Sequence, residues 1–428
     1  MSAKRRCPRI LFASALAAAF CGEANAAPPD GLFGDWGGLL STLSDDGVRV
    51  QAKYISDIAW NPSGGKSQGT RYADQWSLGA DFDLGKLANI DNAMLHITLS
   101  NRDGRNLTQD TIGNEVQVQQ IYGDGQNFRL DDFWYQQSFG GHLEIRLGRL
   151  HESDDFAYFS CDYQNLGFCS APYAILADSG WNNPPLGVWG GRIKFTSGGW
   201  YAETGAYQVN PTYALSGSGF KLGTSGDTGT LFPAEVGWSG ELGAQALPGG
   251  YKIGGYYDSS DAPDLYEDVH GQPAALTGLP ARERDGRYGG YLMALQQVTS
   301  GSSGSGQGLS VFANATIADR NTALIRDSLT MGAWYKEPFA SRPGDVIEFA
   351  AARFDFNTRL SDYQRLLNAE QAGPIGVQGA ETDLIVQYNA KLSSWCTLGP
   401  NFQYVIHPNG LNSIANAFVV GLQTTIKF

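Results

Sequence analysis

The sequence lacks an apolar run long enough to cross a bilayer as a helix. The run from Ile10 to Phe20 is well short of the ~20 residues that a spanning helix needs, and no apolar helix follows it. If the chain enters a membrane, it must do so as a closed β-barrel, because lipid offers no hydrogen-bond partner to an unpaired backbone group. The helical class of membrane protein is therefore excluded.

Basic residues are also scarce. Lys and Arg number 30 against 43 Asp and Glu, so the formal net charge is −13. A partner rich in phosphate needs clustered Lys and Arg, and nucleic acid is therefore excluded. Charged residues make up only 17% of the chain, whereas glycine reaches 55 residues and aromatics 12%. This composition favours many turns and two-faced strands over helices.

Histidines are few and scattered, and no catalytic motif accompanies them. The five histidines show no metal-ligand spacing: His96, His142, His151, His270 and His407. Neither a phosphate-cradling glycine loop nor a nucleophile elbow is present. Asp154 and Asp155 are adjacent carboxylates, and we interpret them as a solvated turn. We therefore expect no catalytic residue, no cofactor and no metal.

The first 26 residues have the pattern of a secretory signal. Four basic residues precede the apolar run, and "ANA" precedes Ala27. A lipoprotein signal is disfavoured because the bulky Phe20 precedes Cys21. Removal of this segment takes away four basic residues and one acidic residue, which leaves a formal charge near −16.

Three cysteines remain after this segment. Cys161 and Cys169 are eight residues apart in one loop, and we predict that they form a disulfide in an oxidising compartment. Two free thiols are the alternative. Cys396 is left without a partner.

The remainder divides into a short leading segment and a long strand-rich region. Residues 27–47 are predicted to be a periplasmic segment with a short helix, because Trp36, Leu39, Leu40 and Leu43 recur at spacings of three and four. Residues 48–428 are predicted to form an all-β, antiparallel transmembrane barrel of about sixteen strands. The predicted strands start near residues 48, 75, 93, 132, 142, 189, 201, 234, 251, 288, 309, 328, 345, 381, 395 and 414.

The connections between these strands alternate in length. Outer-membrane barrels have short periplasmic turns and long outer loops, and this pattern is present if the N-terminus is periplasmic. A secreted β-sandwich has no reason to segregate loop length in this way. The predicted outer loops include 102–131, 150–188, 210–233, 259–287 and 357–380. The loop at about 150–188 is long and aromatic, so we expect it to fold inward and narrow the channel.

The last strand has one apolar face that ends on Phe428. Phe418, Val420, Leu422 and Ile426 share this face with it. Such a strand is typical of barrels that a dedicated machinery inserts into the outer membrane. We predict that Phe428 is an assembly signal and that this strand closes the barrel against the first one.

Several segments resemble the carbohydrate-selective porin family, the OprB-type outer-membrane porins. They occur in order at 32–48, 147–157, 187–195, 205–211, 308–315, 342–347 and 381–410. The resemblance implies a sixteen-strand porin that passes glucose and other sugars across the outer membrane of Gram-negative bacteria. The family tends to place polar residues where Met293 and Leu295 stand here, and an acidic residue where Ile385 stands.

Strand parity predicts which side chains line the pore. A sugar path needs aromatic rings and charged hydrogen-bonding groups. The predicted pore-lining residues are Asp132, Trp134, Arg146, Arg192, Lys194, Glu203, Arg353, Asp355, Glu381 and Asp383. Arg192 and Lys194 are the preferred donors to sugar hydroxyls. The alternative for each residue is an ion pair within the wall, and Trp134 also fits an interfacial belt.

The predicted function is passive diffusion of glucose-type monosaccharides. A general or cation-preferring pore is the alternative, and a barrel hydrolase is a distant one. The expected partners are sugars in transit, outer-membrane lipid with lipopolysaccharide, and the barrel-assembly machinery. Monomer and homotrimer both remain open.

Overall fold

The strands of this chain close into a barrel. The computed structural model describes residues 31–123, 125–159, 162–301, 306–370 and 374–428, so the predicted signal at 1–26 lies outside the described residues. The barrel strands are β1 (Val48–Gly65), β2 (Gly69–Asp83), β3 (Ala93–Gly104), β4 (Phe128–Phe139), β5 (Leu143–Leu150), β6 (Val188–Ser197), β7 (Trp200–Val209), β8 (Gly229–Leu242), β9 (Leu247–Asp258), β12 (Arg287–Gln297), β13 (Gly308–Ile317), β14 (Ile325–Lys336), β15 (Val346–Phe356), β16 (Ala380–Lys391), β17 (Cys396–Ile406) and β18 (Ala415–Lys427).

Each barrel strand pairs with its neighbour along the chain, and β18 pairs antiparallel with β1 to complete the ring. The predicted all-β barrel of about sixteen strands is confirmed. The predicted starts differ most at β2, which begins at Gly69 rather than near 75. Polar residues there pair with β1, for example Thr70 with Trp60. The first outer connection is therefore only 66–68, which departs from the expected long outer loops.

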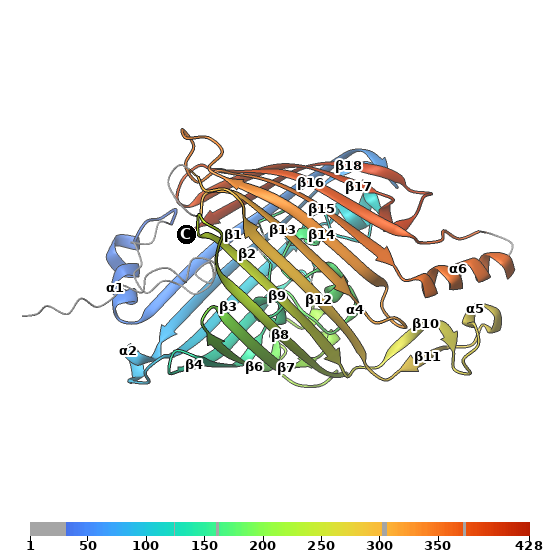
Figure 1. Cartoon of the computed structure of the whole chain (residues 1–428), viewed down its shortest axis with the longest axis horizontal. Helices are drawn as coiled ribbons and strands as arrows, with labels where there is room; N and C mark the ends of the chain where they lie inside the picture. Colours follow the sequence, from blue (N-terminus) through green and yellow to red (C-terminus); the bar gives the residue numbers. More distant parts are fainter. Residues whose placement is uncertain (1–30, 124, 160–161, 302–305, 371–373) are drawn as a thin grey trace, which may run out of the picture.

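The remaining elements are short helices and a small two-stranded sheet. They are η1 (Trp36–Gly38), α1 (Leu39–Asp45), α2 (Leu84–Ala88), η2 (Thr108–Ile112), α3 (Glu152–Asp155), η3 (Leu166–Phe168), α4 (Tyr173–Asp178), η4 (Pro211–Ala214), α5 (Ala274–Thr277), α6 (Thr358–Glu370) and η5 (Pro408–Gly410), with strands β10 (Ala262–Asp268) and β11 (Ala281–Arg284). Figure 1 shows α1 and α2 at one end, and α5, α6, β10 and β11 at the other. The predicted short N-terminal helix is confirmed as α1.

The faces of the strands are reversed relative to a soluble protein. Apolar side chains such as Phe195, Ile253 and Leu292 are more than half exposed on the outside, whereas Glu235 and Gln387 are buried inside. This reversal is expected where lipid surrounds the barrel and polar groups face its lumen. No helix in the described ranges is long and apolar enough to span a membrane, a finding that does not bear on strands.

The C-terminal residue packs at the closing seam. The backbone N–H of Phe428 donates to the carbonyl of Ala52 at 3.0 Å, and its ring stacks on Trp76 at 5.4 Å between centroids. Phe33 lies 5.6 Å from the same ring. The last residue is therefore held by β1, β2 and the leading segment together.

Candidate functional site

The connection between β5 and β6, residues 151–187, fills part of the lumen. We call it the lumen segment. It contains α3, η3 and α4, and its aromatic side chains are buried: Phe156, Phe159, Tyr163, Phe168 and Trp181. Phe159 packs on Phe312 of β13 at 4.4 Å between ring centroids. Trp181 meets Tyr256 of β9 edge-on at 5.8 Å. The segment therefore crosses the lumen from its root on β5 to the facing strands.

The strands that receive this segment present apolar side chains to the lumen. We call these side chains the apolar wall. Its members are Tyr291 and Met293 of β12, Phe312 of β13, Ile325 of β14, Ala350, Ala352 and Phe354 of β15, and Ile385 of β16. Apolar burial drives this docking, because an aqueous lumen would otherwise hydrate these groups. Met293 and Ile385 thus belong to the packing surface under the lumen segment.

Hydrogen bonds to strand carboxylates hold the lumen segment in place. The backbone N–H of Ala157 donates to Glu235 at 2.8 Å, and that of Gly180 donates to Asp258 at 2.8 Å. The side-chain amide of Asn165 donates to Asp383 at 3.0 Å. Buried backbone donors left without such partners would cost ~1–3 kcal/mol each, so these carboxylates determine where the segment lies.

A second segment, residues 105–127 between β3 and β4, also enters the lumen. The N–H groups of Glu115 and Val116 donate to the two oxygens of Glu381 at 2.8 and 2.9 Å. The amide of Gln119 donates to the Asp57 carbonyl at 2.8 Å. The structure thus places Glu381 and Asp383 on the inner face, where they hold the two inserted segments.

A cluster of charges occupies the neighbouring arc of the barrel, on β5 to β9. We call it the charged wall. Arg192 contacts Glu144 at 2.5 Å, Asp155 of α3 at 3.0 Å and Glu203 at 3.8 Å. Its side chain is only 3% exposed. Because Asp155 belongs to the lumen segment, Arg192 fixes the root of that segment to the barrel.

Two other cations of the charged wall are more accessible. The Lys194 ammonium lies 3.3 Å from Glu203 and 4.2 Å from the ring centroid of Tyr201, with its side chain 30% exposed. Arg146 is 17% exposed and bonds Asp155 at 2.9 Å. These cations are reached by water from the lumen, whereas Arg192 is enclosed.

Arg146 also covers an aromatic pair at the start of this wall. Its guanidinium lies 4.3 Å from the ring of Trp134, which stacks on His96 at 4.8 Å. The indole N–H donates to Asp132 at 3.0 Å. Trp134 is 9% exposed, so it faces the lumen and does not belong to the outer aromatic belt. Gly148 lies opposite it in the ladder, where a Cβ would come within 2.3 Å of the Phe133 carbonyl.

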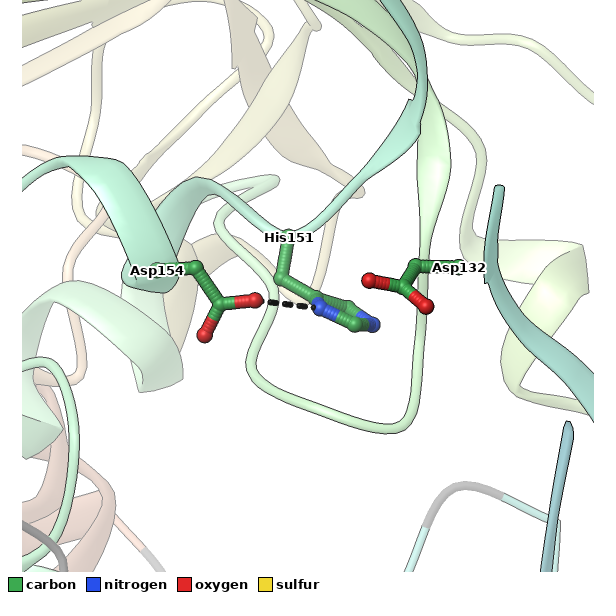
Figure 2. A group of neighbouring side chains, drawn as sticks. All are labelled: Asp132, His151 and Asp154. Atoms are coloured by element: carbon green, nitrogen blue, oxygen red, sulfur yellow. Dashed lines mark hydrogen bonds and ion pairs between the residues drawn. The ribbon is translucent and has the colours of Figure 1, made fainter. Parts of the chain in front are cut away.

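His151, the first residue of the lumen segment, is held between carboxylates. Its Nδ1 lies 2.8 Å from Asp154 and its Nε2 lies 2.8 Å from Asp131. Figure 2 shows Asp154 and Asp132 on either side of the ring. Burial disfavours the charged ring, but the two carboxylates raise the pKa of His151 well above its usual value. The protonated ring of His151 therefore links Asp154 of α3 to Asp131 of β4.

The same group has the composition of a cation site. Ligand atoms of Asp132, His151 and Asp154 lie within 4.8 Å of one another. However, both nitrogens of the His151 ring already contact carboxylates, and a metal would have to displace those contacts. The arrangement therefore fits a charged tether better than a metal centre.

An elongated cavity of about 1180 Å³ lies between the lumen segment and the β1–β3 side of the barrel. Polar strand residues line one side, including Gln51, Lys53, Gln75 and Arg102. The lumen segment lines the other side with Asp154, Tyr158, Asp162, Tyr173 and Trp181. Asn210, Ser260 and Arg287, at the outer ends of their strands, border it as well. This cavity extends from Lys427, near the periplasmic end of β18, toward the outside.

Two predicted pore residues are placed wrongly by strand parity. Arg353 and Asp355 lie on the outer face of β15, on the same side as the exposed Phe349. They pair with each other at 2.7 Å, and the Arg353 side chain is 59% exposed. The bulky Phe354 and Phe356 take the inner face, where Tyr173 of the lumen segment covers Phe354 at 5.7 Å between ring centroids. The rule that apolar side chains point outward therefore fails for this strand.

The remaining predicted residues gather on one side of the lumen: Asp132, Trp134, Arg146, Arg192, Lys194 and Glu203. None of them is among the residues that line the cavity. Cys169 is disulfide-bonded and Cys396 is a free thiol. Cys161 lies outside the described residues, so its pairing with Cys169 stays a prediction.

Sequence reasoning missed several residues that the structure makes central. Glu235 accepts hydrogen bonds from Ala157, Tyr201 and Tyr291 at 2.8, 2.5 and 2.8 Å. Its inward position follows from the alternation of β8, so parity was a usable signal. The same alternation along β1 and β3 also indicates that Lys53 and Arg102, which line the cavity, point inward. Their importance depends on where the inserted segments leave space, and local sequence carries no such information.

A closed sixteen-strand barrel with an apolar exterior and a lumen narrowed by inserted segments defines an outer-membrane porin. Comparison with known proteins gives the family. The family described as carbohydrate-selective porin, OprB family, matches residues 67–428. Porin B of Pseudomonas aeruginosa is 36% identical over 427 residues, which cover 96% of this chain and 94% of that protein.

The fold of a solved relative agrees. The high pH structure of Pseudomonas putida OprB superposes with a TM-score of 0.90 at 34% identity, and the match covers 94% of this chain and 99% of that one. The chain belongs to the OprB family of carbohydrate-selective porins. It is a passive sugar porin of the Gram-negative outer membrane.

Proposed function

We propose that this porin selects glucose-type monosaccharides, and that they pass through the cavity beside the lumen segment. The mixed lining of that cavity supports the proposal. Tyr158, Tyr173 and Trp181 offer aromatic surfaces, while the amides of Gln51 and Gln75 offer hydrogen bonds. Sugars carry apolar C–H faces and many hydroxyls, so they use both kinds of surface.

The proposed contacts are individually weak, as transport requires. A single tight site would retain the solute, whereas several modest sites allow it to move on. The cavity offers such sites along its length rather than one enclosed pocket. Its volume of about 1180 Å³ exceeds the ~300–1,000 Å³ typical of pockets that enclose a small ligand.

We assign different roles to Arg192 and Lys194, the two residues of the charged wall that were predicted to donate to sugar hydroxyls. Arg192 is enclosed by three carboxylates, so we propose that it positions the lumen segment. Lys194 is 30% exposed beside Tyr201, and we propose that it donates to sugar hydroxyls outside the cavity, at the periplasmic side of the segment. Arg146 above Trp134 offers the same combination of cation and ring.

Liposome swelling tests the proposed selectivity. Vesicles containing the porin are placed in isotonic sugars, amino acids and salts of graded size. We expect glucose and other hexoses to enter faster than non-sugars of equal size. Uniform, size-dependent permeation would instead support a general pore, and faster permeation of cations would support a cation-preferring one.

Block of single-channel current by glucose tests the route. Replacing Tyr158 with Leu is expected to weaken the block several-fold, because the ring lines the cavity. Phe195→Leu is the matched control, since Phe195 lies on the outer face and is 53% exposed. Equal glucose block in the wild type and Tyr158→Leu would contradict the proposed route.

We further infer that the chain has no catalytic role, since the family and the fold point to a channel. Assays for hydrolysis of ester and peptide substrates by the purified porin test this inference. We also infer that Phe428 guides assembly by the barrel-insertion machinery, supported by its docking on β1 and Trp76. Its deletion is expected to lower the amount of folded barrel in the membrane before it changes transport.

A further inference from the structure

Two lysines face each other at the seam of the barrel. Lys53 on β1 is directly opposite Lys427 on β18, and both line the cavity. Directly opposed residues on antiparallel strands share one face, with Cβ atoms ~5 Å apart, and like charges at such positions are destabilising. The strand pairing alone therefore gives no reason for this arrangement.

Among the described residues, no side chain forms an ion pair with either ammonium group. In the part of the chain that the structure describes, the ion pairs include neither Lys53 nor Lys427, and neither side chain takes part in a hydrogen bond. Other lumen cations are paired: Lys194 with Glu203, Lys252 with Glu235, and Arg287 with Asp258. The seam thus carries two adjacent positive charges that are open to the cavity.

The far side of the cavity has a different character. Asp154 and Asp162 of the lumen segment line it, together with the ring of Tyr158. A small inorganic anion between these sides would be attracted by the lysines and repelled by the carboxylates. A solute with a carboxylate at one end and hydroxyls along the rest suits both sides, because hydroxyls donate to carboxylates and ammonium groups donate to a carboxylate.

We propose that Lys53 and Lys427 form a binding site for the carboxylate of polyhydroxylated acids. The porin would then pass sugar acids of the aldonate class in addition to neutral sugars. The lysines bind the carboxylate, while Asp154, Asp162 and Tyr158 contact the hydroxylated part. This inference rests on the proposed route through the cavity, and it extends the solute class of that route.

Single-channel recording with D-gluconate and D-glucose tests the proposal. Removal of both lysines is expected to weaken gluconate block by about fivefold to tenfold, because the carboxylate loses both of its cationic partners. The variant is Lys53→Gln with Lys427→Gln, which also relieves the repulsion at the seam and should therefore fold. Glucose block is expected to stay within about twofold.

Two controls separate the site from general charge effects. Lys391→Gln removes a lysine at the end of β16 that does not line the cavity, and it should leave gluconate block unchanged. Lys53→Arg with Lys427→Arg retains both charges and should restore most of the gluconate block.

The ratio of gluconate to glucose block decides the matter. An unchanged ratio in the double Gln variant would overturn the proposal. So would an equal loss of chloride permeability and gluconate block, which would indicate general attraction of anions. If glucose failed to enter wild-type vesicles, the proposed function would fail instead, and the lysine dependence of gluconate block would still decide this inference.

Discussion

The two sides of the lumen hold the same segment by different physical means. The apolar wall on β12 to β16 binds it through packed rings and aliphatic side chains, with Phe312 against Phe159 as the closest ring pair. The charged wall on β5 to β9 holds its root through Arg192 and Asp155. Hydrophobic packing is non-directional, whereas ion pairs require defined geometry. Packing on the apolar wall thus stabilises the docked segment, whereas the ion pairs of the charged wall fix the position of its root.

The largest effect is expected from a deletion in the apolar wall. Phe312→Ala removes a buried ring that contacts Phe159 and Trp334. Loss of such a side chain costs about 3–5 kcal/mol, so the folded barrel should unfold at a lower temperature in detergent. Single-channel conductance should rise, because the lumen segment loses the packing of Phe159 on Phe312 that holds it inside the barrel.

Phe349→Ala is the control for that deletion. Phe349 is of the same type but lies on the outer face of β15, 48% exposed. Its replacement should leave conductance unchanged. If Phe312→Ala also had wild-type conductance, the apolar wall would not be what keeps the segment inside.

The second-largest effect is expected from a substitution that removes Arg192 from the charged wall. Arg192→Met leaves Glu144, Asp155 and Glu203 without their shared cation. Removal of one partner from a buried ion pair typically costs ~3–5 kcal/mol, and part of this cost is avoided here because Lys194 and Arg146 remain nearby. We expect lower thermal stability and a shift toward cation preference, measured as a reversal potential. An unchanged reversal potential would contradict the proposed role of this wall.

The link between the lumen segment and β14 is expected to depend on pH. Asp178 accepts a backbone N–H from Ile325 at 3.2 Å and another from Leu324 at 2.5 Å. Burial outweighs these bonds and raises the pKa of Asp178 to about 7. The folded state therefore favours the protonated carboxyl of Asp178. The stability that this group contributes is full below about pH 3.8 and is lost as the pH rises through about 7.

Asp178→Asn tests this dependence. The amide cannot ionise, so the variant should lose the part of the stability change between pH 4 and 7 that Asp178 causes, on the order of 1–3 kcal/mol. Thermal unfolding at several pH values measures it. Parallel pH profiles of the variant and the wild type would show that Asp178 does not titrate in this range.

The contacts of His151 with Asp131 and Asp154 should respond in a different pH window. The pKa of His151 is raised by Asp154 and Asp131, so the stability it supplies is full below about pH 6.5 and is lost as the pH rises through the raised value. His151→Gln should therefore destabilise the barrel by ~1–2 kcal/mol at pH 6, with the charge-assisted bonds as the cause. The difference should shrink at alkaline pH. A constant difference across pH would indicate a packing role only.

The smallest effect is expected outside the lumen. Arg353 forms an exposed pair with Asp355 on the outer face, and such pairs contribute ~0–1 kcal/mol. Arg353→Gln should change thermal stability little and should leave glucose block unchanged. A clear loss of glucose block in this variant would place Arg353 in the transport path after all.

Arg353 also shows where sequence reasoning stops. In most strands the lumen side is polar, and alternation places Arg146, Arg192 and Glu203 correctly on the inner face. In β15 the inner face carries Ala350, Ala352, Phe354 and Phe356, because the inserted segments cover it. Parity based on polarity then selects the wrong face. The same covering explains Met293 and Ile385.

The barrel, its strands and the alternation of loop lengths could be predicted from the amino-acid sequence alone. These features depend on local rules: a period of two along each strand, turn residues between strands, and an apolar band for lipid. The pairing of the lumen charges, the wall that receives the inserted segments and the place of the cavity became clear only in the folded barrel. Those outcomes depend on contacts between residues far apart in the chain, such as Asn165 with Asp383 and Lys53 with Lys427, which no local pattern specifies.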